Sequence, residues 1–441
     1  MEEKHKEAAR IVPKGFVRKY TKGNLRIVGQ FHHGAVKPCH WQEQRLLTGR
    51  DNRNCYKGYF GIESHLCVQN TPTLPFCNLG CVFCWRDIEK GTLDSTFPTM
   101  NPEEYDSPAI LVEEMIRHSR NIINHHLKLG RSLDNLAKMQ TALEDLVQKW
   151  EETGENLPRT EREISKTVGI SLTSGHRALN LLDDCGVLDS DEENQYWIQP
   201  AVLEEIHAKT DVPAIIEKYV TTEREIRQVF KDAQNPKHAA ISLAGEPMLY
   251  PEIGDLVAEF RHREMTTFIV TNGTQPEKIK QLASKNQLPT QLYVTLAAPS
   301  AELYQELCRP GEPGEWEKLQ ESLRLLKDLP TRTVIRITCV KHANMDLSFV
   351  PAYGEIIREA QPDFLDLKGF TIQAHALEMQ DRYQGAHDLL EYSPTHEELS
   401  AFAHEFEEQF GFEILESIPV SRDLLLRVKW PKGKSILITD P

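Results

Sequence analysis

Short apolar runs alternate with amphipathic segments over the second half of the chain. The runs lie at residues 238–247, 266–273, 291–298, 332–340 and 363–370, and each ends in small or polar residues. Helix-period patterns lie between them, at residues 252–264, 276–286, 316–328 and 346–360. With HLCVQNTPTL (65–74) as the first strand, this alternation predicts six βα units. Near-continuous apolar strands covered by helices are typical of a parallel sheet, so we predict an α/β fold containing a partial (β/α)6 barrel.

The carboxyl ends of the predicted strands carry polar residues and glycine. In parallel α/β folds the chemistry lies at these strand ends. Here they carry a cysteine-rich loop after the first strand and, after later strands, Gly245, Glu246, Asn272, Thr295 and Lys368. Turn formation alone does not explain such a convergence, which predicts a functional site at this edge of the sheet.

One segment interrupts the alternation. The first two predicted strands lie far apart in the sequence, whereas a βαβ unit needs roughly 30 residues. Helical patterns at 108–129 and 213–233 are assigned to the barrel, and residues 131–212 are predicted to be an insertion. Within it, TEREISKTVGISLTSGHRALNLLDDCGVLDSDEENQYWI (160–198) predicts helix, turn, helix and a short hairpin, the pattern of a winged helix.

The charge of this insertion bears on its role. It carries eight Lys and Arg against seventeen Asp and Glu, and its predicted wing reads DSDEEN. A winged helix usually suggests DNA binding, but a phosphate backbone would be repelled by such a surface. We therefore favour a protein-docking or purely structural module over a nucleic-acid-binding one.

Composition and charge are those of an ordinary globular protein with one basic region. Apolar residues make up 40% of the 441 residues, charged residues 27%, and the net charge is −15. Residues 1–60 carry a net charge of +8, which fits either an anionic macromolecular partner or a solvated surface. We find no apolar run of the roughly 20 residues that a bilayer requires, and MEEKHKEAARIVPKG is too charged for a signal peptide. These features predict a cytoplasmic protein with reduced thiols and no membrane partner.

Six of the nine cysteines lie between residues 39 and 84. Cys77, Cys81 and Cys84 form a C-x3-C-x2-C loop, and three thiolates in one loop suit an iron–sulfur cluster that leaves one iron open. Upstream cysteines with polar neighbours indicate a second metal site, although buried, inert thiols are the alternative; these are Cys39, Cys55 and Cys67. Cys185, Cys308 and Cys339 are scattered and are interpreted as packing residues.

The motifs together resemble one family. CNLGCVFC is similar to the loop of radical S-adenosylmethionine (SAM) enzymes, and the closer resemblance is to the tRNA 4-demethylwyosine synthases. It rests, in chain order, on VKPCHW, CYKGYFGIESHLCVQNTP, CVFCWR, ISLAGEPMLYPEI, VTNGTQPE, QLYVTLAA, RTVIRITCVK and LKGF. It covers roughly residues 30–120 and 230–400. Residues 131–212 have no counterpart in the family pattern, and ILESIPVSRDLLL lacks the expected histidine, so no role is carried over to either stretch.

The resemblance implies a radical SAM partial barrel and its cofactors. SAM would chelate the open iron of a [4Fe-4S] cluster on Cys77, Cys81 and Cys84, and a fourth cysteine would block that position. Phe83 and Trp85 would pack around cluster and adenine, and the residues of the GEP motif would receive the methionine amino group. The SAM-binding residues implied are Phe83, Gly245, Glu246, Pro247, Asn272 and Thr295.

The resemblance also implies the reaction, one of the lyase class. N1-methylguanosine at position 37 of phenylalanine tRNA would be condensed with pyruvate into the three-ring base 4-demethylwyosine. A second [4Fe-4S] cluster would lie on Cys39, Cys55 and Cys67, and Lys57 would form a Schiff base with the pyruvate ketone. Such a lysine should have a depressed pKa. The first 60 residues would contact the tRNA, and an external ferredoxin or flavodoxin would supply electrons.

Two other classes of protein share part of this sequence pattern. Another radical SAM enzyme, acting on RNA or a small molecule, would share the three-cysteine loop but not CYKG with the upstream cysteines. An iron–sulfur regulator would explain a winged helix but would not need six βα units.

The predicted domains are a basic region at 1–68, a barrel at 69–130 and 213–411, the insertion at 131–212, and a C-terminal extension at 412–441.

Overall fold

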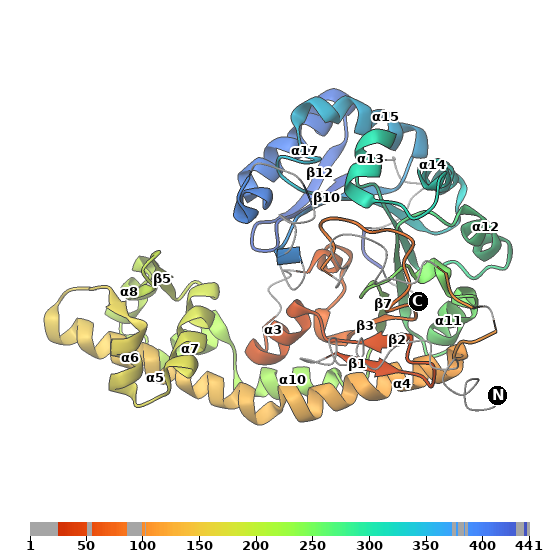
Figure 1. Cartoon of the computed structure of the whole chain (residues 1–441). Helices are drawn as coiled ribbons and strands as arrows, with labels where there is room; N and C mark the ends of the chain where they lie inside the picture. Colours follow the sequence, from red (N-terminus) through yellow and green to blue (C-terminus); the bar gives the residue numbers. More distant parts are fainter. Residues whose placement is uncertain are drawn as a thin grey trace.

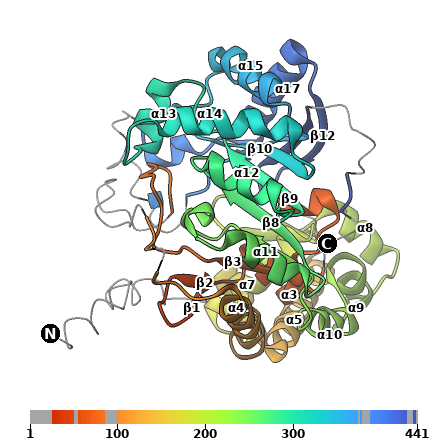
Figure 2. The same ribbon diagram turned by 90° about the vertical axis from the view of Figure 1, so that its right-hand side faces the viewer.

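The computed structural model describes residues 25–50, 55–85, 99–101, 103–372, 376–377, 383, 387–428 and 436–438. Its largest element is a ten-stranded sheet with the strand order β1-β2-β3-β7-β8-β9-β10-β11-β13-β12. The sheet curves through the body of the molecule, and helices cover its outer side (Figures 1 and 2).

Six consecutive strands in the middle of this sheet are parallel. They are β3 (Cys67–Thr71), β7 (His238–Ile241), β8 (Thr266–Thr271), β9 (Gln291–Thr295), β10 (Arg332–Cys339) and β11 (Phe364–Gly369). Each one lies within a segment that the sequence pattern predicts as a strand. The prediction of six parallel βα units is confirmed.

Antiparallel strands extend both edges of the parallel sheet. On one edge, β2 (Gly34–Val36) pairs with β3, and β1 (Arg26–Val28) pairs with β2. On the other edge, β13 (Asp423–Arg427) pairs with β11, and β12 (Glu413–Ile418) pairs with β13. In the described chain β1 and β12 are the two ends of the sheet. The C-terminal extension expected at 412–441 thus contributes two strands to the main sheet.

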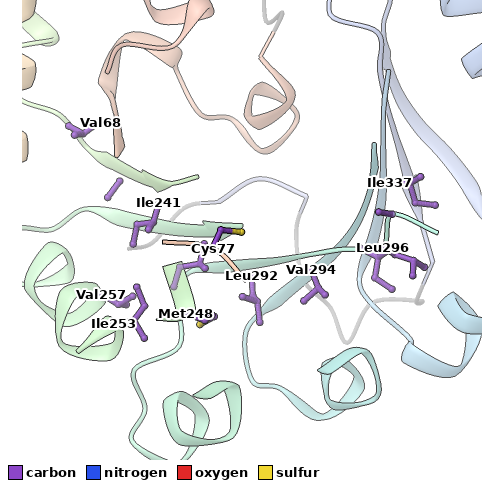
Figure 3. Close-up of a cluster of buried hydrophobic side chains, with 14 of the residues drawn as sticks. Val68, Cys77, Ile241, Met248, Ile253, Val257, Leu292, Val294, Leu296 and Ile337 are labelled. Atoms are coloured by element: carbon purple, nitrogen blue, oxygen red, sulfur yellow. The ribbon is translucent and has the colours of Figure 1, made fainter. Parts of the chain in front are cut away.

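Helices pack on the outer side of the parallel strands, where the core lies. They are α4 (Pro108–Ile122), α10 (Glu223–Asp232), α11 (Ile253–Arg261), α12 (Pro276–Ser284), α13 (Ala301–Cys308), α14 (Glu315–Leu325), α15 (Val350–Ala360) and α17 (His396–Phe410), with short 3-10 turns η7 (Pro247–Leu249), η8 (Leu326–Asp328), η9 (Leu347–Phe349) and η11 (Leu389–Tyr392). Figure 3 shows buried side chains of the sheet, among them Ile241 of β7 and Leu292 and Val294 of β9, together with Ile253 and Val257 of α11.

The chain between β2 and β3 forms short helices. They are α3 (His40–Thr48) and the 3-10 turns η1 (Tyr56–Phe60) and η2 (Ser64–Leu66). Cys39 caps α3, because its Sγ accepts the amide of Gln42 at 3.4 Å. Gly49 ends the helix with φ +70°, a conformation that glycine adopts without steric cost.

The predicted insertion projects from the barrel on one long helix (Figure 1). A π-helical turn, η5 (Ile123–Leu127), leads into α5 (Leu129–Thr153), and a second, η6 (Ile216–Val220), leads back to the barrel. Between them lie β4 (Arg159–Thr160), α6 (Glu161–Val168), α7 (Leu172–Asp184), β5 (Leu188–Ser190), β6 (Gln195–Ile198), α8 (Pro200–His207) and α9 (Val212–Ile215). The helix–turn–helix and hairpin are where the sequence pattern puts them, and β4 adds a third strand to the hairpin.

The insertion has its own hydrophobic core, which runs from Met139 to Val220. The first turns of α5 belong to the barrel instead, since Leu129 and Leu133 pack against the main core. Leu136 touches both cores. The predicted boundary at residue 131 therefore falls inside a continuous helix.

Several helices begin at a capping box that the sequence encodes. Thr160, Thr222 and Thr395 start α6, α10 and α17, and each accepts the amide of a glutamate three residues later, which bonds back. In the described part of the chain, none of the helices combines the length and apolarity needed to cross a bilayer.

Candidate active site

The three-cysteine loop is fixed at the carboxyl end of β3 by backbone hydrogen bonds to the turn after α13. The amide of Gly80 donates to the carbonyl of Arg309 at 3.2 Å, and that of Val82 donates to Leu307 at 2.9 Å. The side chain of Asn78 donates to Thr274 at 2.8 Å and accepts from Asn272 at 2.9 Å. The loop is therefore attached to the C-terminal end of α13 and to the turn between β8 and α12.

A cavity of about 360 Å³ lies between this loop and the carboxyl ends of the strands. Its lining brings together the residues predicted for the first cluster and for SAM, namely Cys77, Cys81, Cys84, Phe83, Gly245, Glu246, Pro247, Asn272 and Thr295. Trp85 lines it too, and so does Cys308, which the sequence analysis interpreted as a packing residue. Cys77 also belongs to the main buried cluster (Figure 3).

Gly245 lies where a side chain would not fit. Its φ is +73°, and a Cβ there would overlap the carbonyl oxygen of Thr73 and lie 2.7 Å from that of Phe76. The next residue, Glu246, donates its amide to the same Phe76 oxygen at 2.7 Å. The glycine thus lets the loop after β7 pack directly on the chain that leads into the cysteines.

Glu246 is 1% exposed, and its carboxylate is occupied by the chain itself. It accepts hydrogen bonds from the Met248 amide at 3.0 Å, the Thr271 hydroxyl at 2.6 Å and the Asn272 amide at 2.7 Å. A buried carboxylate needs such donors. Glu246 thus links the loop after β7 to the end of β8 through hydrogen bonds, and it also lines the first cavity.

A second cavity, of about 490 Å³, adjoins the first. Cys39, Cys55 and Lys57 line it, and Cys67 is buried nearby at the start of β3. Each of the three thiols acts electrostatically on Lys57. The structure therefore gathers the upstream cysteines and the predicted lysine, although they are spread over 29 positions in the sequence.

Lys57 is 4% exposed. Its Nζ donates to the Tyr56 hydroxyl at 3.0 Å and lies 4.2 Å from the centre of the Tyr56 ring. Burial lowers the pKa of Lys57, but its electrostatic interactions with Tyr56, Cys55, Cys67 and Cys39 raise it, and the net direction is upward. The expectation of a depressed pKa is therefore wrong for the chain without its clusters.

The two cavities share a wall. Residues that line both are Trp85, Ser242, Leu243, Val270, Arg336 and Lys368. Arg336 extends from β10 with its guanidinium 3.9 Å from the Tyr56 ring centre, and its Nε lies 2.9 Å from Asp366 Oδ2. Lys368 lies 3.0 Å from Asp423. Sequence reasoning missed Arg336, Tyr56, Asp366 and Asp423; the available signal was a charged residue, Arg336, inside an otherwise apolar strand.

The cysteines fit the groups that the sequence predicts. Cys77, Cys81 and Cys84 line the first cavity, whereas Cys39 and Cys55 line the second, with Cys67 buried close enough to act on Lys57. Three cysteine ligands suit a cubane cluster with one open iron. The first cavity provides the space beside Cys77, Cys81 and Cys84.

Comparisons with known proteins agree with this geometry. A model of the radical SAM superfamily matches residues 205–347. An S-adenosyl-L-methionine-dependent tRNA 4-demethylwyosine synthase of Pyrococcus horikoshii is 31% identical over 417 residues, which cover 94% of this chain and 89% of the relative.

The chain belongs to the tRNA 4-demethylwyosine synthase family.

Other members of this synthase family match over similar lengths. The relative from Methanocaldococcus jannaschii is 25% identical over 419 residues, covering 95% of this chain and 97% of that protein. The human relative is 26% identical over 388 residues, covering 87% of this chain but 37% of the human protein. The predicted resemblance to this family is confirmed.

Solved structures described as TYW1, a name that the human relative also carries, share the fold. A structure described as TYW1 with a lysine–pyruvate adduct bound has a TM-score of 0.60 at 22% identity and covers 95% of this chain and 97% of that chain. A crystal structure of archaeal TYW1 has a TM-score of 0.55 at 21% identity, covering 95% and 96%. The synthase family is a radical SAM family, so SAM and an iron–sulfur cluster are its cofactors.

Proposed function

We propose that this chain condenses N1-methylguanosine at position 37 of phenylalanine tRNA with pyruvate to form 4-demethylwyosine. Family membership supports the reaction class. The observation that carries the proposal is the pair of adjoining cavities, one beside Cys77, Cys81 and Cys84 and the other containing Lys57. A radical formed in the first cavity would lie next to a carbonyl substrate bound in the second.

Two cofactor sites follow from the two sets of cysteines. In the first cavity Cys77, Cys81 and Cys84 would hold a [4Fe-4S] cluster, while Phe83, Gly245, Glu246, Pro247, Asn272 and Thr295 would surround SAM. The reduced cluster and SAM, when bound there, would supply the radical chemistry needed to remove a hydrogen atom from the N-methyl group. The second cluster would lie on Cys39, Cys55 and Cys67.

Lys57 is the proposed catalytic residue. After its ammonium group has lost a proton, the amine would add to the ketone carbon of pyruvate, and loss of water would leave an imine that holds the substrate in place. Burial of Lys57 excludes bulk water that would hydrolyse the imine, and Tyr56 fixes the position of Nζ. The lysine–pyruvate adduct described for the solved relative supports this step.

The remaining partners are proposed on chemical grounds. The tRNA would contact the basic first 60 residues, of which 1–24 and 51–54 lie outside the described residues. Reduction of the clusters would need an external ferredoxin or flavodoxin. We propose a cytoplasmic location without a membrane partner.

Borohydride trapping tests the role of Lys57. Treatment of the cluster-loaded protein with pyruvate and borohydride should add a pyruvate-derived mass to the peptide that contains Lys57. Lys57→Ala should still bind both clusters and cleave SAM, yet form no tricyclic base. Lys278→Ala is the matched control, because Lys278 is also partly buried but lines neither cavity and donates to the carbonyl of Pro251. An adduct on a different lysine, or normal turnover by Lys57→Ala, would overturn the assignment.

A further inference from the structure

The second cavity is positively charged within an acidic chain. Four cations and two carboxylates line it, namely Lys37, Lys57, Arg336, Lys368, Glu43 and Asp423, whereas the whole chain has a net charge of −15. Such a local excess favours a small anion. Pyruvate is a monoanion, and Lys57 can react only with its ketone. Its carboxylate therefore needs a partner other than Lys57, either the open iron of the cluster proposed on Cys39, Cys55 and Cys67 or another cation of the cavity.

Arg336 is the cation that the structure holds most firmly. Its Nε lies 2.9 Å from Asp366, its Nη2 lies 3.9 Å from Asp423, and its guanidinium stacks 3.9 Å from the Tyr56 ring centre. The side chain is 13% exposed, and it lines both cavities. A guanidinium has five N–H donors. In the described chain, the two carboxylates orient its fork and leave donors for a ligand in the cavity.

Arg336 is also close to the reactive amine. The Tyr56 ring centre lies 4.2 Å from Lys57 Nζ and 3.9 Å from the Arg336 guanidinium carbon. The separation of the two cations therefore cannot exceed the sum of these distances, about 8 Å. An imine nitrogen and a guanidinium carbon paired with the adjacent carboxylate are roughly 6 Å apart, given ordinary hydrogen-bond lengths. The span of a three-carbon α-keto acid lies within this upper limit.

We propose that Arg336 binds the carboxylate of pyruvate and so selects an α-keto acid over an uncharged carbonyl compound. The inference rests on the proposed function, since it concerns the substrate of the same site. A guanidinium pairs with a carboxylate through two parallel hydrogen bonds, which fixes the rotation of the substrate about its attachment to Lys57. Arg336 thereby presents one face of the former ketone carbon to the first cavity.

Substitution of Arg336 tests this assignment through two substrates of equal size. Arg336→Gln should weaken borohydride trapping of pyruvate at Lys57, with the half-saturating concentration rising on the order of ten- to a hundredfold. Trapping of hydroxyacetone, a neutral three-carbon ketone, should hardly change. Arg332→Gln is the matched control: Arg332 is on the same strand and stacks 5.2 Å from Phe60, but it lines neither cavity. It should trap pyruvate as the parent does.

Two further variants keep the test decisive if Arg336→Gln does not fold. Arg336→Gln with Asp366→Asn removes both partners of the buried pair, so no lone charge remains. It should also lose pyruvate trapping and keep hydroxyacetone trapping. Arg336→Lys keeps the positive charge but not the paired N–H donors of the guanidinium. Its half-saturating concentration of pyruvate should lie between those of the parent and of Arg336→Gln.

The outcomes separate the inference from the proposed function. Trapping of pyruvate in the folded double variant at the parent's half-saturating concentration would overturn the role of Arg336 and leave Lys57 in place. A loss of SAM affinity without a loss of pyruvate trapping would also overturn it, because Arg336 would then serve the first cavity. Absence of pyruvate trapping in the parent would overturn the Lys57 step, and the inference with it.

Discussion

Replacing Gly245 with alanine should disrupt the contact between the loop after β7 and the chain that leads into the three cysteines. The residue has φ +73°, and an added Cβ would overlap the Thr73 carbonyl oxygen and lie 2.7 Å from that of Phe76. Both obstacles are backbone atoms, which cannot rotate away as a flexible side chain could. The loop must therefore move, and Glu246 must move with it.

The magnitude follows from two separate costs. A left-handed conformation costs a non-glycine residue about 1–2 kcal/mol. Overpacking against fixed atoms costs about 1–3 kcal/mol more. Gly411→Ala separates the two, because Gly411 has φ +70° with no atom within 4 Å of an added Cβ. We expect Gly245→Ala to lower the free energy of unfolding by about 2–5 kcal/mol and Gly411→Ala by about 1–2 kcal/mol.

Urea unfolding followed by circular dichroism would measure both variants, and equilibrium dialysis would measure SAM binding by the folded proteins. Gly245→Ala should bind SAM more weakly, since Gly245 and Glu246 line the first cavity. Gly411→Ala should bind it as the parent does. Equal loss of stability in the two variants, or full SAM affinity in Gly245→Ala, would refute the close-approach argument.

Three further predictions address the clusters, the insertion and a buried acid. Replacing Cys77, Cys81 and Cys84 together with alanine should abolish formation of 5′-deoxyadenosine while a second cluster stays visible spectroscopically; continued formation would contradict the ligand assignment. Excising residues 140–220 with a short linker should preserve SAM cleavage, because that segment has its own core and the excision leaves Leu133 and Leu136 in the barrel; a soluble, cluster-loaded variant without cleavage would assign the segment to the active fold. Burial raises the pKa of Asp366 from 3.8 to about 6, so its protonated form favours folding below pH 3.8 and this contribution is lost as pH rises through about 6. Urea midpoints should therefore fall less between about pH 4 and about pH 7 in Asp366→Asn than in the parent, and an identical fall in both would show that Asp366 does not titrate there.

The parallel strands β7 to β11 were predictable because each lies in an apolar run longer than a turn, and β3 (CVQNT) was predicted as the strand before the cysteine loop. The edge strands were not. β1 and β2 have three residues each, too few to show a period of two, and β12 is largely exposed on both faces. Their place in the sheet follows from pairing with distant strands, which the local sequence does not encode.

The residues of the candidate site also fall into two groups, those that local sequence predicts and those that only the folded sheet brings together. Cysteine spacing and the GEP motif are local, so the residues of the first cavity could be predicted. The ion network around Arg336 depends on tertiary pairing, because β13 lies antiparallel to β11 and sets Asp423 opposite Lys368. Asp423 belongs to the C-terminal stretch to which no family role was carried over. Two carboxylates and two cations from three strands meet only after the sheet has formed.

Glu246 lines the first cavity, but the sequence did not reveal the partners of its carboxylate. The sequence suggested a carboxylate for an ammonium group, and the residue does line the first cavity. Its oxygens, however, accept the amides of Met248 and Asn272 and the hydroxyl of Thr271. Only the fold reveals that these donors converge on it.

The central claim is tested most directly by anaerobic incubation of the cluster-loaded protein with SAM, a reductant, isotope-labelled pyruvate and tRNA that carries N1-methylguanosine. The nucleosides are then analysed by mass. The account predicts a tricyclic base that contains ¹³C when the pyruvate is uniformly labelled with ¹³C. Unchanged N1-methylguanosine alongside active SAM cleavage, or a product without pyruvate carbon, would contradict it.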